Sequence, residues 1–281
     1  MNPTAERSNR NDAGFTLTEL LAVIGIIAVL SAMLLPAMGG TKSQSRIVTC
    51  AANFRQWAVA VNLYAKDNQE WLPGANGVVA GGGMYVWEVP TNMCHLLGGY
   101  GVDVPKWFCP SRPSEMDVAN GWATSNYGHA ISTLDELKDY FLRNYPDTLF
   151  ANHNWWVPRS QGTTSFPADL TRAPLIAPWL KESLSTQYGW PRKLHDNAAA
   201  HVPFISDKCG SGNDPSTGLG TPLSGSAGHT IADISPNTAH FFGGKFANLN
   251  AAYADGHVET RGPNQTKCAY VAAIGSTFWF Y

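Results

Sequence analysis

Charged residues are scarce in this sequence, at 14% of its 281 residues, against about 25% in an average soluble domain. The net charge is −2 and no basic stripe follows the chain, which excludes a protein that binds the phosphate backbone of nucleic acids. Aromatic residues make up 11% of the chain, which excludes a disordered protein, because disordered segments are poor in aromatics. One long apolar run is present, so a polytopic membrane protein is excluded as well.

Recognisable catalytic motifs are also absent. The sequence has no GxSxG, no HExxH, no P-loop, and no GxGxxG that precedes a helix and an acid, so none of the enzyme classes that these motifs mark is indicated. Its five cysteines include no CxxC pair, which argues against a zinc ribbon. We therefore predict a protein that is not an enzyme and has no catalytic residues, no cofactor and no metal ligands.

The apolar run covers residues 20–35 and reads LLAVIGIIAVLSAMLL. About 20 apolar residues span the hydrocarbon core of a bilayer as a helix, so we expect residues 15–38 to form a transmembrane segment. A cleaved secretory signal, cut near Ala37, is the alternative. Glu19 lies inside the start of the segment. A carboxylate at membrane depth is costly unless it is paired, which marks Glu19 as a functional candidate.

The residues around Glu19 carry a resemblance to a known family. The stretch 14–19 reads GFTLTE and precedes the apolar run. It resembles the N-terminal motif of type IV pilins and type II secretion pseudopilins, in which a peptidase cuts after a Gly, the new N-terminal Phe is methylated, and the fifth mature residue is Glu. The resemblance implies cleavage between Gly14 and Phe15, N-methylation of Phe15, and assembly through Glu19. It also places Pro36 where many pilins carry a helix-kinking proline.

The same resemblance implies the organisation of the chain and its function. Residues 1–14 are the expected cytoplasmic leader, residues 15–38 the single inner-membrane helix, residues 39–67 its extracytoplasmic continuation, and residues 68–281 a head in the periplasm or at the cell surface. The implied partners are prepilin peptidase, other pilin-like subunits and an inner-membrane assembly platform. The implied function is a structural subunit of a type II secretion pseudopilus or a type IV pilus-like filament. The alternative is a membrane-anchored binding module that uses the leader only for insertion.

Apolar residues at helical spacing continue after the membrane segment and predict one face packed in a core. The whole helix, from about Leu17 to Lys66, would be about 75 Å long. Residues 132–144 and 178–187 predict two short helices. The apolar positions of the long helix are Ile47, Cys50, Ala51, Phe54, Trp57, Ala58, Val61, Tyr64 and Ala65.

Residues 247–260 predict a β-hairpin, because Asp255-Gly256 stands between two extended runs and is typical of a two-residue turn. The expected fold is therefore α+β and pilin-like. In this fold a long N-terminal helix, transmembrane at its start and kinked at Pro36, packs on a small antiparallel sheet with loop-rich insertions. The tryptophans and tyrosines of the middle region are expected in the core, and a face that binds a sugar or a polymer is the alternative.

A second resemblance connects both ends of the head to pseudopilins with a C-terminal H-x9-DG motif. It implies that His240, Asp255 and Gly256 are motif residues. Fourteen residues separate His240 from Asp255, so either an insertion lengthens the intervening loop or His240 is not the family's histidine. The segments that carry this resemblance are 50–56 (CAANFRQ), 64–68 (YAKDN), 72–73 (LP), 109–111 (CPS) and 254–258 (ADGHV).

Because this pattern includes two cysteines, it implies a disulfide between Cys50 and Cys109, which would persist in an oxidising compartment. The alternative is that all the cysteines are buried thiols. A calcium site with oxygen ligands is the alternative to a chain without metal. Its candidate ligands are Asp207, Asn213, Asp214 and Asp233.

Overall fold

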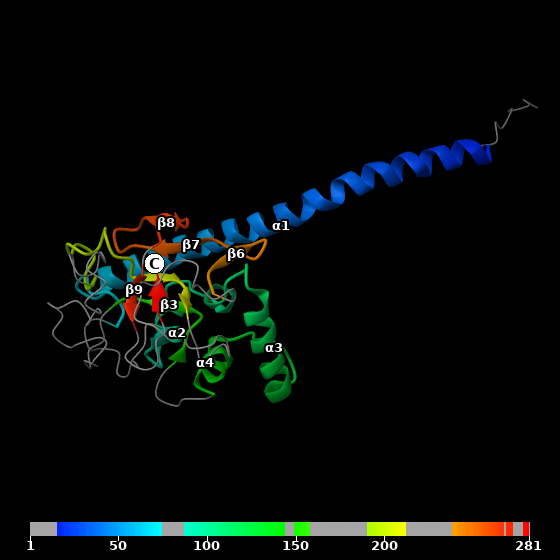
Figure 1. Cartoon of the computed structure of the whole chain (residues 1–281). Coiled ribbons are helices and arrows are strands. Elements are labelled where there is room, and N and C mark those ends of the chain that lie inside the picture. Colours follow the sequence, from blue (N-terminus) through cyan, green and yellow to red (C-terminus); the bar gives the residue numbers. More distant parts are fainter. Residues whose placement is uncertain are drawn as a thin grey trace, which may run out of the picture. The chain divides into compact units, whose positions relative to one another are not determined.

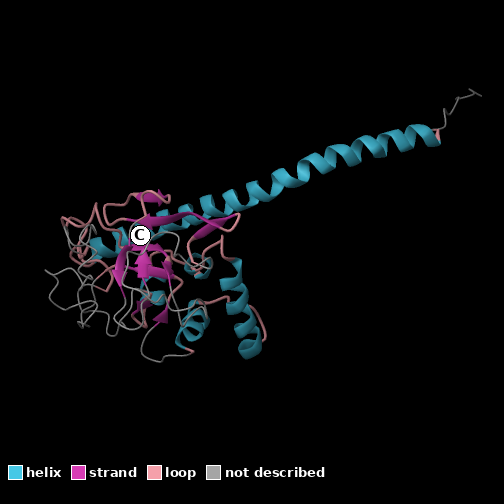
Figure 2. Ribbon diagram, in the orientation of Figure 1, coloured by secondary structure: helices cyan, strands magenta, loops and turns pink. Residues whose placement is uncertain are grey.

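The computed structural model describes residues 16–74, 87–143, 149–157, 190–211, 238–266, 268–271 and 278–280. By contacts the chain divides into two compact units, Met1–Ser45 and Arg46–Tyr281. Figure 1 shows the elements along the chain, and Figure 2 separates helices from strands by colour. Gly14 and Phe15, on which the predicted cleavage depends, lie outside the described residues.

Helix α1 (Leu17–Asp67) confirms the predicted long N-terminal helix. It continues as helix through Pro36 and the following Gly39-Gly40 pair, and a kink at Pro36 stays a prediction. In the second unit its predicted apolar face is buried, except that Ala51 is half-buried. The helical spacing therefore identified the side of α1 that packs in the core of the head.

In the first unit, the large apolar side chains of α1 that the structure describes are exposed. Leu17, for example, is 80% exposed. Within the described ranges, no helix combines the length and the hydropathy that crossing a bilayer requires. Large contiguous apolar surfaces mark sites of contact with lipid or protein. We call the exposed apolar side chains of this part of α1 the apolar helix surface. It comprises Leu17, Leu20, Leu21, Val23, Ile24, Ile26, Ile27, Val29, Leu30 and Met33.

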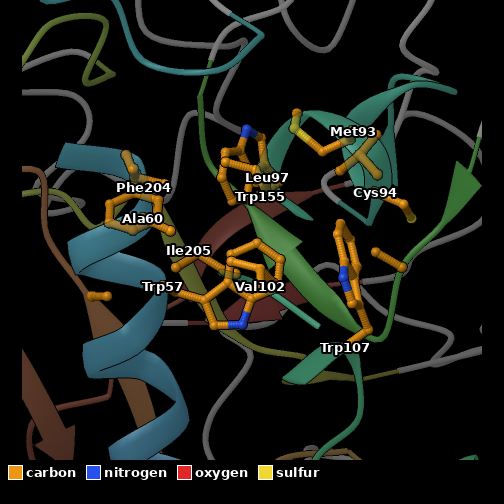
Figure 3. Packing of buried hydrophobic residues seen from close by; sticks show 14 of the residues in the cluster. Trp57, Ala60, Met93, Cys94, Leu97, Val102, Trp107, Trp155, Phe204 and Ile205 are labelled. Carbon is orange, nitrogen blue, oxygen red and sulfur yellow. The ribbon is translucent and has the colours of Figure 1, made fainter. Parts of the chain in front are cut away.

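The core of the head is built on aromatic side chains around α1. Figure 3 shows Trp57 and Ala60 of α1 together with Trp107, Trp155 and Ile205. The expected core position is confirmed for the six described tryptophans that are buried, and these six cannot form a sugar-binding face. Six are buried and two are partly buried: Trp57, Trp87, Trp107, Trp155, Trp156 and Trp190, then Trp71 and Trp122.

The helices that follow α1 are short. Residues 132–144 were predicted to be helical, and α4 forms there with a capping box: Glu136 N donates to Thr133 Oγ1 at 3.2 Å, and Thr133 N donates to Glu136 Oε2 at 3.1 Å. The predicted helix at 178–187 lies outside the described residues. The helices are α2 (Met93–Gly98), η1 (Val104–Trp107), α3 (Pro113–Tyr127) and α4 (Leu134–Leu142).

An antiparallel sheet, as predicted, forms the other part of the head. Its central strand β7 pairs with β4, β6 and β8, and β4 also pairs with β3. The strands of this sheet are β3 (His153–Trp155), β4 (Ile205–Asp207), β6 (His240–Phe242), β7 (Lys245–Ala252) and β8 (Val258–Arg261). Two smaller sheets pair β1 (Glu88–Val89) with β2 (Leu149–Phe150), and β10 (Phe278–Phe280) with β5 (Gly210–Ser211) and β9 (Cys268–Val271).

Strands β7 and β8 form a hairpin, but its connection differs from the predicted two-residue turn. Ala252 pairs with Val258, so the connection holds the five residues 253–257. Gly256 has a positive φ of 98°, whereas Asp255 does not have a positive φ. A type I′ turn requires positive φ at both central residues, so the Asp-Gly pair here shapes a longer loop. Asp255 stabilises this loop by accepting a hydrogen bond from His257 N at 3.1 Å.

Candidate functional site

The first candidate site is the start of α1, which holds Glu19. Glu19 Oε2 accepts hydrogen bonds from Thr16 N at 2.9 Å and from Thr16 Oγ1 at 2.8 Å. In return, Glu19 N donates to Thr16 Oγ1 at 3.2 Å. These reciprocal bonds form a capping box, in which a Thr before the helix and a Glu in its first turn satisfy each other's backbone N–H groups. Glu19 therefore has a local role in starting the helix, in addition to the assembly role that the sequence predicted.

The second candidate site is a cluster of four buried side chains in the head: Cys50, Cys109, Asp207 and His240. Four separate segments bring them together, because Cys50 lies on α1, Cys109 follows η1, Asp207 ends β4, and His240 begins β6. We call them the four-residue cluster. Each of the four residues is at most 1% exposed.

The polar atoms of the four-residue cluster converge on a common centre. The sulfur of Cys109 lies 3.5 Å from that of Cys50 and 3.4 Å from His240 Nε2. Asp207 Oδ2 lies 3.2 Å from His240 Nε2 and 3.8 Å from the sulfur of Cys50. One potential ligand atom from each side chain lies within 4.8 Å of the three others. The set could therefore hold a metal ion, although the sequence analysis expected no metal ligands.

The outer bonds of the cluster fix the orientation of its members. His240 Nδ1 lies 2.7 Å from Asn248 Oδ1. Because the amide oxygen can only accept, Nδ1 carries the proton and Nε2 faces the cluster. Asp207 Oδ2 accepts a hydrogen bond from Asn250 N at 2.7 Å. The two asparagines lie on β7, so the central strand of the sheet orients both the imidazole and the carboxylate.

A buried ion pair lies beside the cluster. Arg112 Nε donates to Glu115 Oε1 at 2.7 Å, and Arg112 Nη1 lies 3.9 Å from Asp207 Oδ1. The guanidinium also donates to the carbonyls of Ala239 at 3.1 Å and Asn152 at 3.3 Å. Arg112 is 7% exposed. A buried arginine is tolerated only where such partners satisfy it, so these bonds connect the loop before α3 to the strands that carry the cluster.

The charges in the cluster depend on one another. Burial raises the pKa of Asp207, and burial raises the pKa of Cys50. Burial opposes ionisation of Cys109 too, but its hydrogen bond with Cys50 and the charge of Arg112 outweigh burial and lower the pKa of Cys109 below its ordinary value. For His240, burial is outweighed by the Asp207 carboxylate, and its pKa rises to about 9. Of the two cysteines, Cys109 is therefore the one whose surroundings favour the thiolate.

His153 lies next to the cluster and is uncharged. It pairs with Asp207 across β3 and β4. Burial, with the positive charge of Arg112, lowers the pKa of His153 to about 3. Its ring packs edge-on against Phe54, with centroids 5.4 Å apart. His153 is therefore a neutral ring that packs on Phe54 in the aromatic core beside the cluster.

The structure brings some of the predicted residues together and leaves others apart. Cys50 and Cys109 are neighbours, as the resemblance implied, but they are thiols with sulfurs 3.5 Å apart, and a disulfide between them stays a prediction. His240 is buried in the four-residue cluster, whereas Asp255 is partly exposed and contacts His257 in the β7–β8 loop. Gly256 shapes that loop.

Two members of this region were missed by the sequence analysis. Asp207 was considered only as a calcium ligand, but its neighbours are two sulfurs and an imidazole, which calcium does not prefer. The other calcium candidates (Asn213, Asp214 and Asp233) lie outside the described residues. No sequence pattern marks Arg112. The available signal was that Cys50, Cys109 and His240 belong to one family-like pattern, which suggests one site.

Comparisons with known proteins agree with the first candidate site. A family model described as the prokaryotic N-terminal methylation motif matches residues 9–35, which include Gly14, Phe15 and Glu19. The type II secretion system core protein G of Pseudomonas aeruginosa is 29% identical over 71 residues, which is 25% of this chain and 50% of that protein. This chain therefore spans half the length of the curated relative that it matches. No solved structure matches it.

These comparisons do not include the H-x9-DG motif, so the resemblance of the C-terminal segments stays a prediction. The N-terminal motif and the similarity to core protein G confirm the predicted resemblance to type II secretion pseudopilins, and they point to a structural protein and not to an enzyme.

Proposed function

We propose that this chain is a pilin-like structural subunit of a type II secretion pseudopilus or a type IV pilus-like filament. Prepilin peptidase cuts it after Gly14, Phe15 is N-methylated, and residues 15–38 hold it in the inner membrane with the head outside the cytoplasm. Other pilin-like subunits and an inner-membrane platform are its partners. The observation that carries this proposal is the methylation motif over residues 9–35, which includes the predicted cut, the predicted methylation site and Glu19.

The apolar helix surface supports an anchoring and assembly role. A helix that exposes so many apolar side chains in water needs a cover, which either lipid or the helices of neighbouring subunits supply. When a subunit leaves the membrane for a filament, its apolar helix surface exchanges contact with lipid for contact with the helices of neighbouring subunits. Such an exchange needs no change in the fold of the head, because the head has its own core around Trp57 and Leu97.

Glu19 supports a specific register between subunits. Its carboxylate would enter an apolar helix bundle, where an unpaired charge is costly and a paired one is tolerated. The amine that cleavage creates on Phe15 of a neighbouring subunit is a suitable partner. Within its own chain, Glu19 already accepts two hydrogen bonds from Thr16, so assembly would add an ionic partner to a carboxylate that is already oriented.

The N-terminal residue of the membrane-extracted protein tests the proposed processing. We expect N-methyl-Phe15 by mass spectrometry, because the cut after Gly14 creates that terminus. A Gly14→Val variant should keep residues 1–14, since a side chain at this position does not fit a site that accepts glycine. An Ala13→Val variant is the matched control and should be cut normally. An intact Met1 in the unsubstituted protein, or a terminus near Ala37, would contradict the proposal.

The Glu19→Gln variant tests the assembly role separately from helix capping. Glutamine can complete the same capping box, so the variant should be processed normally and keep its helix start. It lacks the charge, and we expect its co-purification with other pilin-like subunits to fall at least about tenfold. The control is Thr16→Ala, which removes the capping hydroxyl but keeps the carboxylate. Normal co-purification of Glu19→Gln would favour the alternative of a membrane-anchored binding module.

A further inference from the structure

The four-residue cluster has the ligand composition of a structural zinc site. Zinc is bound in proteins by Cys sulfur, His nitrogen and carboxylate oxygen, and four protein ligands around it are typical of structural sites. The cluster offers two sulfurs, one imidazole nitrogen and one carboxylate oxygen. Soft thiolate ligands favour zinc over calcium and magnesium, which prefer oxygen. The chemistry of the donor atoms therefore selects a thiophilic metal ion.

The spacing of the donor atoms fits a tetrahedron around zinc. Zn–S bonds of about 2.3 Å and Zn–N or Zn–O bonds of about 2.0 Å place neighbouring ligand atoms roughly 3.3–3.8 Å apart. The distances here are 3.5 Å between the sulfurs and 3.4 Å from Cys109 to His240 Nε2. Asp207 Oδ2 lies 3.2 Å from His240 Nε2 and 3.8 Å from Cys50. The remaining pairs lie within 4.8 Å.

The groups around the cluster are those that orient metal ligands. A metal-bound histidine almost always directs its other ring nitrogen to an acceptor, which fixes the tautomer. Here Asn248 Oδ1 lies 2.7 Å from His240 Nδ1, so Nε2 is left for the metal. Asn250 N holds the carboxylate at 2.7 Å. Two thiolates, a carboxylate and a divalent ion have a net charge of −1, and the Arg112 guanidinium, which also pairs with Glu115, lies 3.9 Å from the Asp207 carboxylate.

We propose that Cys50, Cys109, Asp207 and His240 bind one zinc ion that stabilises the head. The ligands come from α1, the loop before α3, β4 and β6, so the ion would join the helix to the sheet at four points. All four are buried, so the site is closed and has no position for a substrate. Binding releases the thiol protons to solvent as the head folds. The inference does not depend on the proposed filament function.

A disulfide between Cys50 and Cys109 is the main competitor. It would require the sulfurs to approach to about 2.05 Å and would remove two of the four ligands. A disulfide would also not explain why the buried Asp207 and His240 side chains lie beside the two sulfurs. The two thiols face other potential ligands as well as each other, because Cys50 contacts Asp207 and Cys109 contacts His240. This arrangement favours a metal ion over a disulfide.

The first experiment measures metal in the full-length protein, purified in detergent without a polyhistidine tag. We expect about one zinc ion per chain after dialysis, and thiols that react with an alkylating reagent only after a chelator is added. Replacement of zinc by cobalt should produce a thiolate-to-cobalt charge-transfer band and the intense visible bands of tetrahedral cobalt. A Cys50–Cys109 peptide cross-link in a chain without zinc would overturn the proposal. So would a chain with free thiols, no metal and no cobalt spectrum.

Variants then assign the ligands. Cys50→Ser and Cys109→Ser should each lose about half of the charge-transfer intensity or fail to retain the metal, because each removes one of two thiolates. Cys94→Ser is the matched control, since Cys94 is buried in the core but is not a member of the cluster. It should retain the metal and the full spectrum. If a ligand variant does not fold, the cobalt spectrum of the unsubstituted protein still decides whether two thiolates bind the ion.

Discussion

Replacing Trp57 with alanine is expected to lower the free energy of unfolding of the head by about 3–5 kcal/mol. Trp57 is 1% exposed on the buried face of α1. Its ring lies edge-on to Trp107, with centroids 4.8 Å apart, and 6.0 Å from Trp155. Its Nε1 donates to the Lys106 carbonyl at 3.1 Å. Alanine would leave a cavity at the junction of α1, η1 and β3, and would leave that carbonyl without this donor.

Urea unfolding of the full-length chain in detergent, followed by the fluorescence of the remaining tryptophans, measures this loss. The control is Val59→Ala, because Val59 lies on the same helix but is 59% exposed. This change should alter stability by no more than about 0.5 kcal/mol. Trp57→Phe should give an intermediate loss, since it keeps an aromatic ring but not the hydrogen bond. If the Trp57 and Val59 alanine variants lost equal stability, the assignment of Trp57 to the buried face of α1 would be wrong.

Replacing Arg112 with methionine should cost about 3–5 kcal/mol, because removal of one partner of a buried ion pair leaves the other charge unpaired. Glu115 would lose its bond to Arg112 Nε, and the carbonyls of Ala239 and Asn152 would lose their donors. Unfolding in urea is again the measurement. Arg55→Met is the control for loss of an arginine charge at an exposed position of α1 and should change stability little.

A double variant separates the ion pair from the other bonds of Arg112. Arg112→Met combined with Glu115→Leu removes both charges together, so no unpaired carboxylate remains in the core. We expect the double variant to be more stable than Arg112→Met alone. If the double variant were less stable than the single one, the cost would lie in the lost carbonyl contacts or in lost packing, and the pair itself would contribute little.

The helical part of the fold could be predicted because its signal is local. The apolar positions from Ile47 to Ala65 repeat at helical spacing, and all of them except the half-buried Ala51 are buried on one face of α1. Thr133 and Glu136 form the box that starts α4. The β7–β8 connection was less predictable. The Asp-Gly pair favours a tight turn, but the observed pairing ends at Ala252 and Val258, which leaves five residues in the loop.

The four-residue cluster could be predicted only in part, because its members are far apart in the sequence. Cys109 and His240 are 131 residues apart, and Cys50 and Asp207 are 157 apart. Their approach depends on how β4 pairs with β3 and β7, which no local pattern encodes. The family-like pattern placed Cys50 and Cys109 together, but it assigned His240 to a C-terminal motif. Asp207 had no sequence feature that would distinguish it from an ordinary turn residue.

The capping box at the start of α1 lies wholly after the predicted cut, so processing would remove none of its members. The amine created on Phe15 would stand one residue before Thr16, at the end of the helix where the peptide dipoles are positive. It would add a second positive charge to an already positive end. The acid in the first turn is Glu19. The mature helix start would therefore have one carboxylate to offset both the amine and the dipole, and in the proposed filament the same carboxylate would also face the amine of a neighbouring subunit.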